Sequence, residues 1–77
     1  MIATLLKTVE KKSKFGGTFF YAFFKTSEGK SCRACLYPNF GNFKRWQPFI
    51  NREKVVLNGL AIKGNLVDAD SFPKEIV

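Results

Sequence analysis

Hydrophobic and polar positions alternate along most of the chain with a period of two, and no helical period extends beyond about one turn. The first alternating run covers Ile2 to Lys11, where every second residue from Ala3 to Val9 is expected on one face of a strand. The second run covers Thr18 to Thr26. Between them lies a basic loop that ends in two glycines. The pattern therefore predicts two long strands joined by a lysine-rich loop.

A short polar segment, Ser27-Glu28-Gly29, separates the second run from a third that reaches Tyr37. It predicts a three-residue hairpin loop, a type I turn followed by glycine in the left-handed conformation. A two-residue loop would set aromatic against charged positions on both faces, so the three-residue loop is favoured. The register then pairs Phe24 with Cys32, Ala22 with Ala34 and Phe20 with Leu36 on one apolar face, and Phe23 with Arg33, Tyr21 with Cys35 and Phe19 with Tyr37 on the other.

The second half of the chain is less regular. Residues 38–42 are rich in turn formers, and residues 43–50 fit either one helical turn or an ordered loop. Asn58-Gly59 suits a hairpin, but the apolar pattern continues beyond it, so we expect one bent strand over 54–62. A turn at 63–65 and a final strand from Leu66 to Phe72 complete the chain. About five strands in one domain of 77 residues predict an all-β fold, a small closed barrel.

The chain is strongly basic, with 13 Lys and Arg against 6 Asp and Glu and a net charge of +7. Such an excess on one small domain attracts polyanions. Nucleic acid is the first candidate partner and an anionic membrane surface the second, while a merely soluble basic domain is the plain alternative. No hydrophobic run approaches the roughly 18–20 residues that span a bilayer, and the first residues lack a signal-peptide pattern. We therefore expect a cytoplasmic protein with no membrane partner.

Residue types that carry most enzyme chemistry are scarce. The chain has no histidine, the commonest general base and metal ligand. Cys32 and Cys35 form a single CxxC inside a predicted strand, where residues three apart point to opposite faces. Asp68 and Asp70 are the one close carboxylate pair, and they suit a solvated strand edge as well as a cation. We expect no enzyme activity, no cofactor and no metal site.

Aromatic and basic side chains are interleaved over residues 18–46, and five rings fall within the six residues from Phe19 to Phe24. One strand face in a small domain cannot bury them all. Rings left at the surface beside cations suit stacking on the bases of a single-stranded nucleic acid. The candidate nucleic-acid-binding residues are Phe19, Tyr21, Phe23, Lys25, Arg33 and Tyr37 on the central strands, Phe43, Lys44, Arg45 and Trp46 in the following segment, and Lys12 and Lys14 in the first loop.

Several of these residues also have structural interpretations. The strand rings could pack on a dimer partner or a loop, or the faces could be reversed so that Phe20 and Phe24 lie outside. Trp46 fits a core anchor at least as well as a ligand contact, and Phe40 and Phe43 are equally undecided. The lysines of the first loop fit a solvated turn as well as a phosphate contact.

The pattern resembles the small OB-fold single-stranded DNA-binding proteins of filamentous phages and similar mobile elements. The resemblance rests on residues 14–19 leading into a ring-rich second strand and on residues 55–57 and 66–70 as a late strand–turn–strand. It implies a five-stranded OB-like barrel that forms a homodimer, with strand aromatics and basic loop residues contacting the DNA. The matching positions are Phe19, Tyr21, Phe23, Arg33 and Tyr37.

The sequence thus predicts a non-enzymatic protein that binds single-stranded DNA without sequence preference, in the replication or recombination of a phage or mobile element. An RNA-binding cold-shock-like module uses the same kind of aromatic and basic face and is the first alternative. A phage-type protein-interaction or inhibitor domain, with the rings as a protein interface, is the second.

Overall fold

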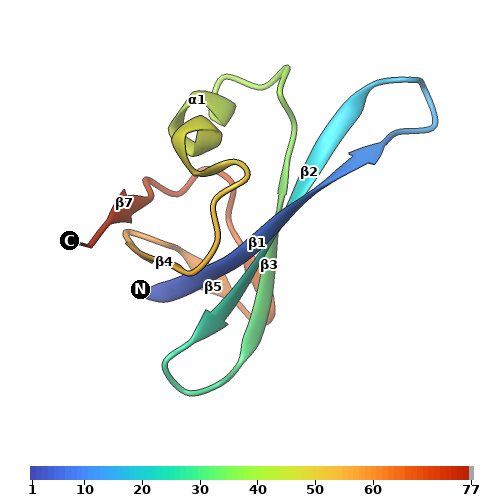
Figure 1. Cartoon of the computed structure of the whole chain (residues 1–77). Coiled ribbons are helices and arrows are strands. Elements are labelled where there is room, and N and C mark those ends of the chain that lie inside the picture. The colour runs from blue at the N-terminus through green and yellow to red at the C-terminus, as the bar shows by residue number, and fades with distance from the viewer. Residues whose placement is uncertain (77) are drawn as a thin grey trace.

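A computed structural model describes residues 1–76, which form one curled β-sheet of seven strands in the order β5-β6-β3-β2-β1-β4-β7 (Figure 1). The long strands are β1 (Ala3–Lys12), β2 (Thr18–Thr26) and β3 (Ser31–Leu36). A short helix, α1 (Phe43–Trp46), and a 3₁₀ turn, η1 (Gln47–Phe49), lead to the remaining strands. These are β4 (Val55–Asn58), β5 (Ile62–Lys63), β6 (Leu66–Val67) and β7 (Lys74–Glu75). The all-β class predicted from the sequence is confirmed.

The register between β2 and β3 is the predicted one. Phe24 lies opposite Cys32, and Phe23 lies opposite Arg33. The turn between the strands has Gly29 at φ 84°, and the Gly29 N–H donates to the Thr26 carbonyl over 2.9 Å. Glycine adopts this left-handed conformation without a Cβ penalty, so the three-residue loop forms as expected. The last predicted pair, Phe19 with Tyr37, falls beyond the end of β3 at Leu36, although the two rings still stack.

The expected faces of β1 are wrong beyond Leu5. Leu5 pairs with Phe24, but the next paired residue, Lys7, lies opposite Phe23, because the register shifts by one residue at Leu6. An extra residue in one strand reverses the alternation that follows it. Lys7 and Val9 therefore share the face of Phe23 and Tyr21 instead of the face of Leu5.

The expected closed barrel of five strands is corrected to a half-barrel of seven. The bent strand expected over 54–62 is divided into β4 and β5, because Gly59 has φ 82° and residues 59–61 belong to neither strand. The expected last strand shortens to the two residues of β6, and β7 is added beside β4. The sheet consequently has two edge strands, β5 and β7.

The core lies on the face of the sheet that carries Phe24, which we call the inner face. Phe24 is fully buried, and the Trp46 ring packs edge-on against it with 6.1 Å between ring centroids. The Trp46 indole N–H donates to the Ala69 carbonyl over 2.8 Å. Helix α1 is therefore fixed over the inner face and tied to the segment that follows β6 (Figure 1). The buried hydrophobic residues are Ala3, Leu5, Ala22, Phe24, Cys32, Ala34, Leu36, Trp46, Phe49, Val55, Leu57, Leu60 and Val67.

The close approach of Gly59 to the 68–72 segment gives a stability prediction. A Cβ at Gly59 would overlap the carbonyl oxygen of Phe72, whereas a Cβ at Gly29, with nearly the same φ, would meet open space. Gly29→Ala should therefore cost only the left-handed backbone penalty of about 1–2 kcal/mol. Gly59→Ala should lower the free energy of unfolding by about 1–3 kcal/mol more, the usual cost of overpacking. Urea unfolding of the two variants measures the difference, and equal losses would contradict the close approach.

Candidate nucleic-acid interface

The candidate interface lies on the face of the sheet opposite the core, which we call the outer face. Phe19, Tyr21 and Phe23 alternate along β2 with the inner-face residues Ala22 and Phe24. The outer-face rings are half-buried, whereas Phe24 is 0% exposed. The two faces are therefore divided as the sequence predicted and are not reversed.

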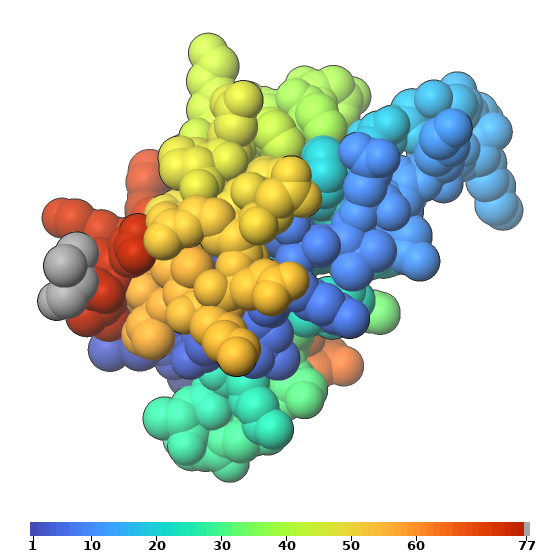
Figure 2. Space-filling view, viewed as in Figure 1, coloured from blue at the N-terminus to red at the C-terminus, as the bar shows by residue number. Residues whose placement is uncertain are grey.

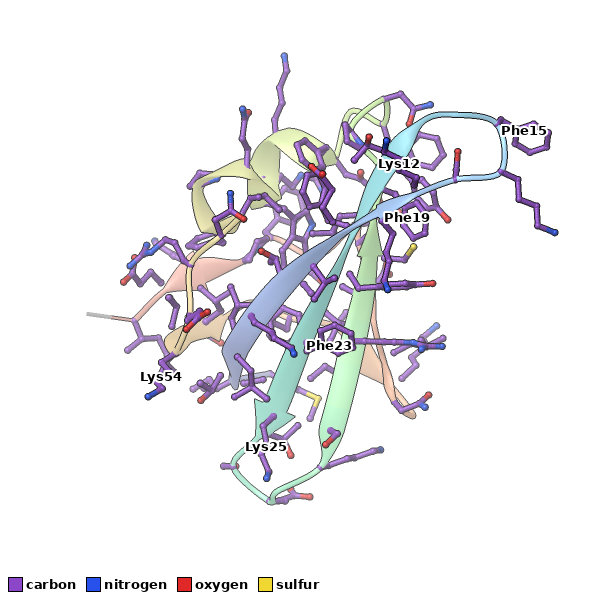
Figure 3. The ribbon with its side chains drawn as sticks, turned by 45° about the vertical axis from the view of Figure 1, so that its right-hand side comes forward. Lys12, Phe15, Phe19, Phe23, Lys25 and Lys54 are labelled. Atoms are coloured by element: carbon purple, nitrogen blue, oxygen red, sulfur yellow. The ribbon has the colours of Figure 1, made fainter. Side chains whose placement is uncertain are left out.

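Five outer rings form one continuous row, which we call the aromatic ladder: Phe23, Tyr21, Phe19, Tyr37 and Phe40. Successive ring centroids are 6.2, 5.2, 5.5 and 5.4 Å apart. The ladder follows β2 and then crosses to the turn after β3, where Tyr37 is 40% and Phe40 is 55% exposed. Figure 3 shows Phe19 and Phe23 along the strand, with Lys25 toward one end and Lys12 toward the other. The result is a stripe of aromatic surface that is half-buried along β2 and exposed at its Tyr37 and Phe40 end.

Cations border the ladder on both neighbouring strands. The Lys7 Nζ lies 5.8 Å from the centroid of the Phe23 ring, and the Arg33 Cζ lies 5.5 Å from that of Tyr21. Both separations are within the range of cation–π attraction. Lys7 comes from β1 and Arg33 from β3, so the rings of β2 lie between two strands that carry positive charge. Aromatic surface and flanking cations together suit a ligand that carries both planar bases and negative charge.

Sequence reasoning missed Lys7 and Phe40 as members of this surface. Unbroken alternation places Lys7 on the face of Leu5, whereas the bulge at Leu6 turns it to the face of Phe23. Two adjacent leucines followed by a lysine, Leu5-Leu6-Lys7, are the trace of this bulge in the sequence. Phe40 was undecided, and its ring packs on Tyr37.

The two cysteines lie on opposite faces of β3. Cys32 is buried in the core, whereas Cys35 pairs with Tyr21 on the outer face, and both thiols are free. A hydrogen bond with Cys35, which also interacts electrostatically with the phenol, raises the pKa of Tyr37 above its ordinary value. A tyrosine with its ordinary pKa is already uncharged at neutral pH, and this upward shift of the Tyr37 pKa acts in the same direction.

The structure moves three of the predicted site residues away from the ladder. Trp46 is 1% exposed and its indole N–H is already bonded, so it is a core anchor and not a ligand contact. Phe43 packs on the inner-face ring of Phe20, with 5.8 Å between centroids. The Arg45 guanidinium lies 3.8 Å from the centroid of the Phe72 ring and donates to the Asp70 carbonyl over 2.7 Å. Lys44 is exposed on the same helix.

The predicted lysines lie toward the two ends of β1 and β2, and only Lys25 of the paired ones is on the outer face. Lys25 pairs with Thr4 and is exposed, on the side of Phe23. Lys12 pairs with Thr18, so it lies on the opposite side of the ribbon from Phe19. Because of the bulge, Lys11 is the residue that faces Phe19. Lys14 is exposed in the turn between β1 and β2.

Comparison of the chain with protein-family models, with curated proteins and with solved structures finds no match. Within residues 1–76, no group of three or more His, Cys, Asp or Glu side chains could hold a metal ion. In the same part of the chain, no helix has the length and apolar character needed to cross a membrane.

The division of rings between the two faces predicts different effects on stability. Phe24→Ala removes a fully buried ring that contacts Trp46 and should lower the free energy of unfolding by about 3–5 kcal/mol. Phe23→Ala removes a half-buried outer ring and should cost about 1 kcal/mol. Urea unfolding measures both losses. A larger loss for Phe23→Ala would mean that the outer face is covered by protein in solution.

Proposed function

We propose that this protein binds single-stranded DNA without sequence preference, stacking bases on the aromatic ladder and holding phosphates with the surrounding Lys and Arg side chains. The observation that carries the proposal is the row of five contacting rings on the exposed face, bordered by Lys7 and Arg33. Every base has a flat π-face, so stacking on such rings is tolerant of sequence. No catalytic role and no cofactor are part of the proposal.

The spacing of the rings determines how bases would lie. Neighbouring ladder rings are 5.2–6.2 Å apart. A base inserted between two rings needs about twice the carbon–carbon contact distance, or about 7 Å. Bases would therefore stack on the exposed ring faces along the ladder and would not enter between neighbouring rings. Each such stack contributes about 1–3 kcal/mol by alanine substitution.

The strand arrangement supports the proposal. Strand β1 pairs with both β2 and β4, β3 pairs in parallel with β6, and α1 lies in the connection from β3 to β4. If β4 and β5 are taken as one bent strand, this pairing is compatible with an OB-like barrel. That fold binds oligonucleotides on the face of its second and third strands. The ladder and Arg33 occupy those strands and the turn that follows them.

In this proposal the rings stack on bases and do not contact the sugar, whose 2′-hydroxyl distinguishes RNA from DNA. RNA is therefore the first alternative ligand. The homodimer and the role in replication or recombination of a phage or mobile element are proposed on the sequence resemblance alone. A protein partner for the ladder is the remaining alternative, and oligonucleotide binding distinguishes it directly.

Fluorescence anisotropy of labelled oligo-dT at two salt concentrations tests the proposal. Binding should be measurable at low salt and should weaken steeply as salt rises, because phosphate contacts release counterions. Oligo-U of equal length tests the preference for DNA over RNA. If neither oligonucleotide binds at low salt, both the DNA and the RNA hypotheses are excluded, and a protein interface is favoured.

The same assay tests the ladder itself. Tyr21→Ala should weaken oligo-dT binding by roughly 5- to 150-fold, the loss of one base stack. Tyr21→Phe keeps the ring and should bind nearly as the unchanged protein does. If the two variants weaken binding equally, the phenol hydroxyl and not the ring would be the contact.

The flanking cations give a separate prediction. Lys7→Ala should lower affinity and reduce the slope of log K against log salt by about 0.7–1, the effect of one phosphate contact. Lys44→Ala removes the same charge from α1, whose helix packs on the inner face, and should leave the slope nearly unchanged. Equal effects of the two substitutions would show that net charge and not the outer face governs binding.

A further inference from the structure

Strands β1 and β2 extend beyond the body of the domain as a two-stranded arm, residues 11–19. Within the arm, Lys11 pairs with Phe19 and Lys12 with Thr18, whereas β4 pairs with β1 only from Ala3 to Leu5. Figures 1 and 2 show the arm standing away from the rest of the molecule. Its tip carries Phe15, whose side chain points outward in Figure 3 and is 97% exposed.

The turn at the tip of the arm is held by its own hydrogen bonds. The Ser13 N–H donates to the Gly17 carbonyl over 2.7 Å, and the Gly17 N–H donates to the Ser13 Oγ over 3.1 Å. The Gly16 N–H donates to the Ser13 carbonyl over 3.2 Å, with Gly16 at φ 84°. The turn thus holds the Phe15 side chain in solvent, where the ring buries almost no surface and contributes almost nothing to the stability of the fold.

The arm is also the most basic part of the chain. Residues 11–19 contain three lysines, at positions 11, 12 and 14, and no acid. Such a local field favours a polyanion and disfavours a second copy of this chain, which carries a net charge of +7. The ligand that fits this surface is therefore anionic and has flat apolar groups.

An open groove lies between the turn of the arm and the turn after β3. Its lining includes Phe15, Gly17 and Phe19 from the arm and Tyr37 and Asn39 from the turn after β3. Phe19 and Tyr37 are also neighbouring rings of the aromatic ladder, 5.5 Å apart. The groove is therefore continuous with the ladder at the arm end of the outer face.

We propose that this groove is a second base-binding site, in which Phe15 stacks on a base of the single strand that leaves the ladder at Phe19 and Tyr37. The exposed lysines of the arm hold the phosphates on either side of that base. The inference rests on the proposed function and extends it, because it adds a contact region outside the ladder. It also assigns a ligand to Phe15, the one almost fully exposed ring among the described residues.

Two alanine variants test the contribution of Phe15 to binding. Phe15→Ala should weaken binding of a long oligo-dT by roughly 5- to 150-fold, the loss of one stacked base. Its urea midpoint should not change, because the ring is 97% exposed. Phe72→Ala is the matched control: Phe72 is 69% exposed on the C-terminal segment, which Figure 1 places on the opposite side from the arm, and oligo-dT binding should not change. Wild-type affinity for Phe15→Ala would overturn the inference.

A tryptophan at the tip gives a direct readout of stacking. Tryptophan emission of the wild-type protein, excited selectively, comes from Trp46 alone, which is 1% exposed, and should respond little to oligo-dT. Phe15→Trp adds an exposed indole whose emission a stacked base should quench at saturation. If wild-type protein binds oligo-dT but the new emission does not change, the groove site is wrong and the ladder proposal stands. If wild-type protein binds no oligonucleotide, the proposed function fails and the groove site fails with it.

Discussion

The structure depends on the burial of Phe24 against Trp46. This contact fixes which face of β2 is the core, because a shift of one residue in register would exchange every side chain between the two faces. Since rings occupy adjacent positions on β2, fixing Phe24 inside places Phe23 and Tyr21 outside. The position of the aromatic ladder on the outer face is thus a consequence of core packing, and no other interaction is needed to explain it. Helix α1 contributes by supplying Trp46, although its Arg45 contacts Asp70 and Phe72 and not the ladder.

The bulge at Leu6 determines which side chains of β1 lie beside the aromatic ladder. Without it, β1 would place Lys7 and Lys11 on the side of the core, where a charged amine is costly to bury. With it, Leu5 stays inside opposite Phe24 while Lys7 faces Phe23 and Lys11 faces Phe19. One extra residue therefore lets the same strand serve the core at one end and a basic surface at the other. Bulges commonly redirect side chains in this way next to binding sites.

The predictable parts of the fold are those with strong local signals. The Ser27-Glu28-Gly29 turn determined the β2–β3 register and with it four of the five ladder rings, because hairpin geometry depends on loop length. The bulge was not predictable, since its one trace in the sequence, Leu5-Leu6-Lys7, suits an unbroken strand as well. The role of Trp46 depends on where a short helix docks, which is a tertiary contact. The bent strand is split at Gly59, where φ is 82° and the backbone lies close to the Phe72 carbonyl; the Asn58-Gly59 turn signal is there, but the apolar pattern that continues beyond it favours an unbroken strand.

The central claim is that the outer face of β1, β2 and β3 binds a single strand of DNA. Titration of isotope-labelled protein with oligo-dT, followed by backbone amide NMR shifts, tests it residue by residue. The account predicts the largest shifts at Phe19 to Phe23, at Arg33 to Tyr37 and at Lys7, with small shifts along α1. Shifts concentrated on α1 and residues 68–72, or no shifts at low salt, would contradict it.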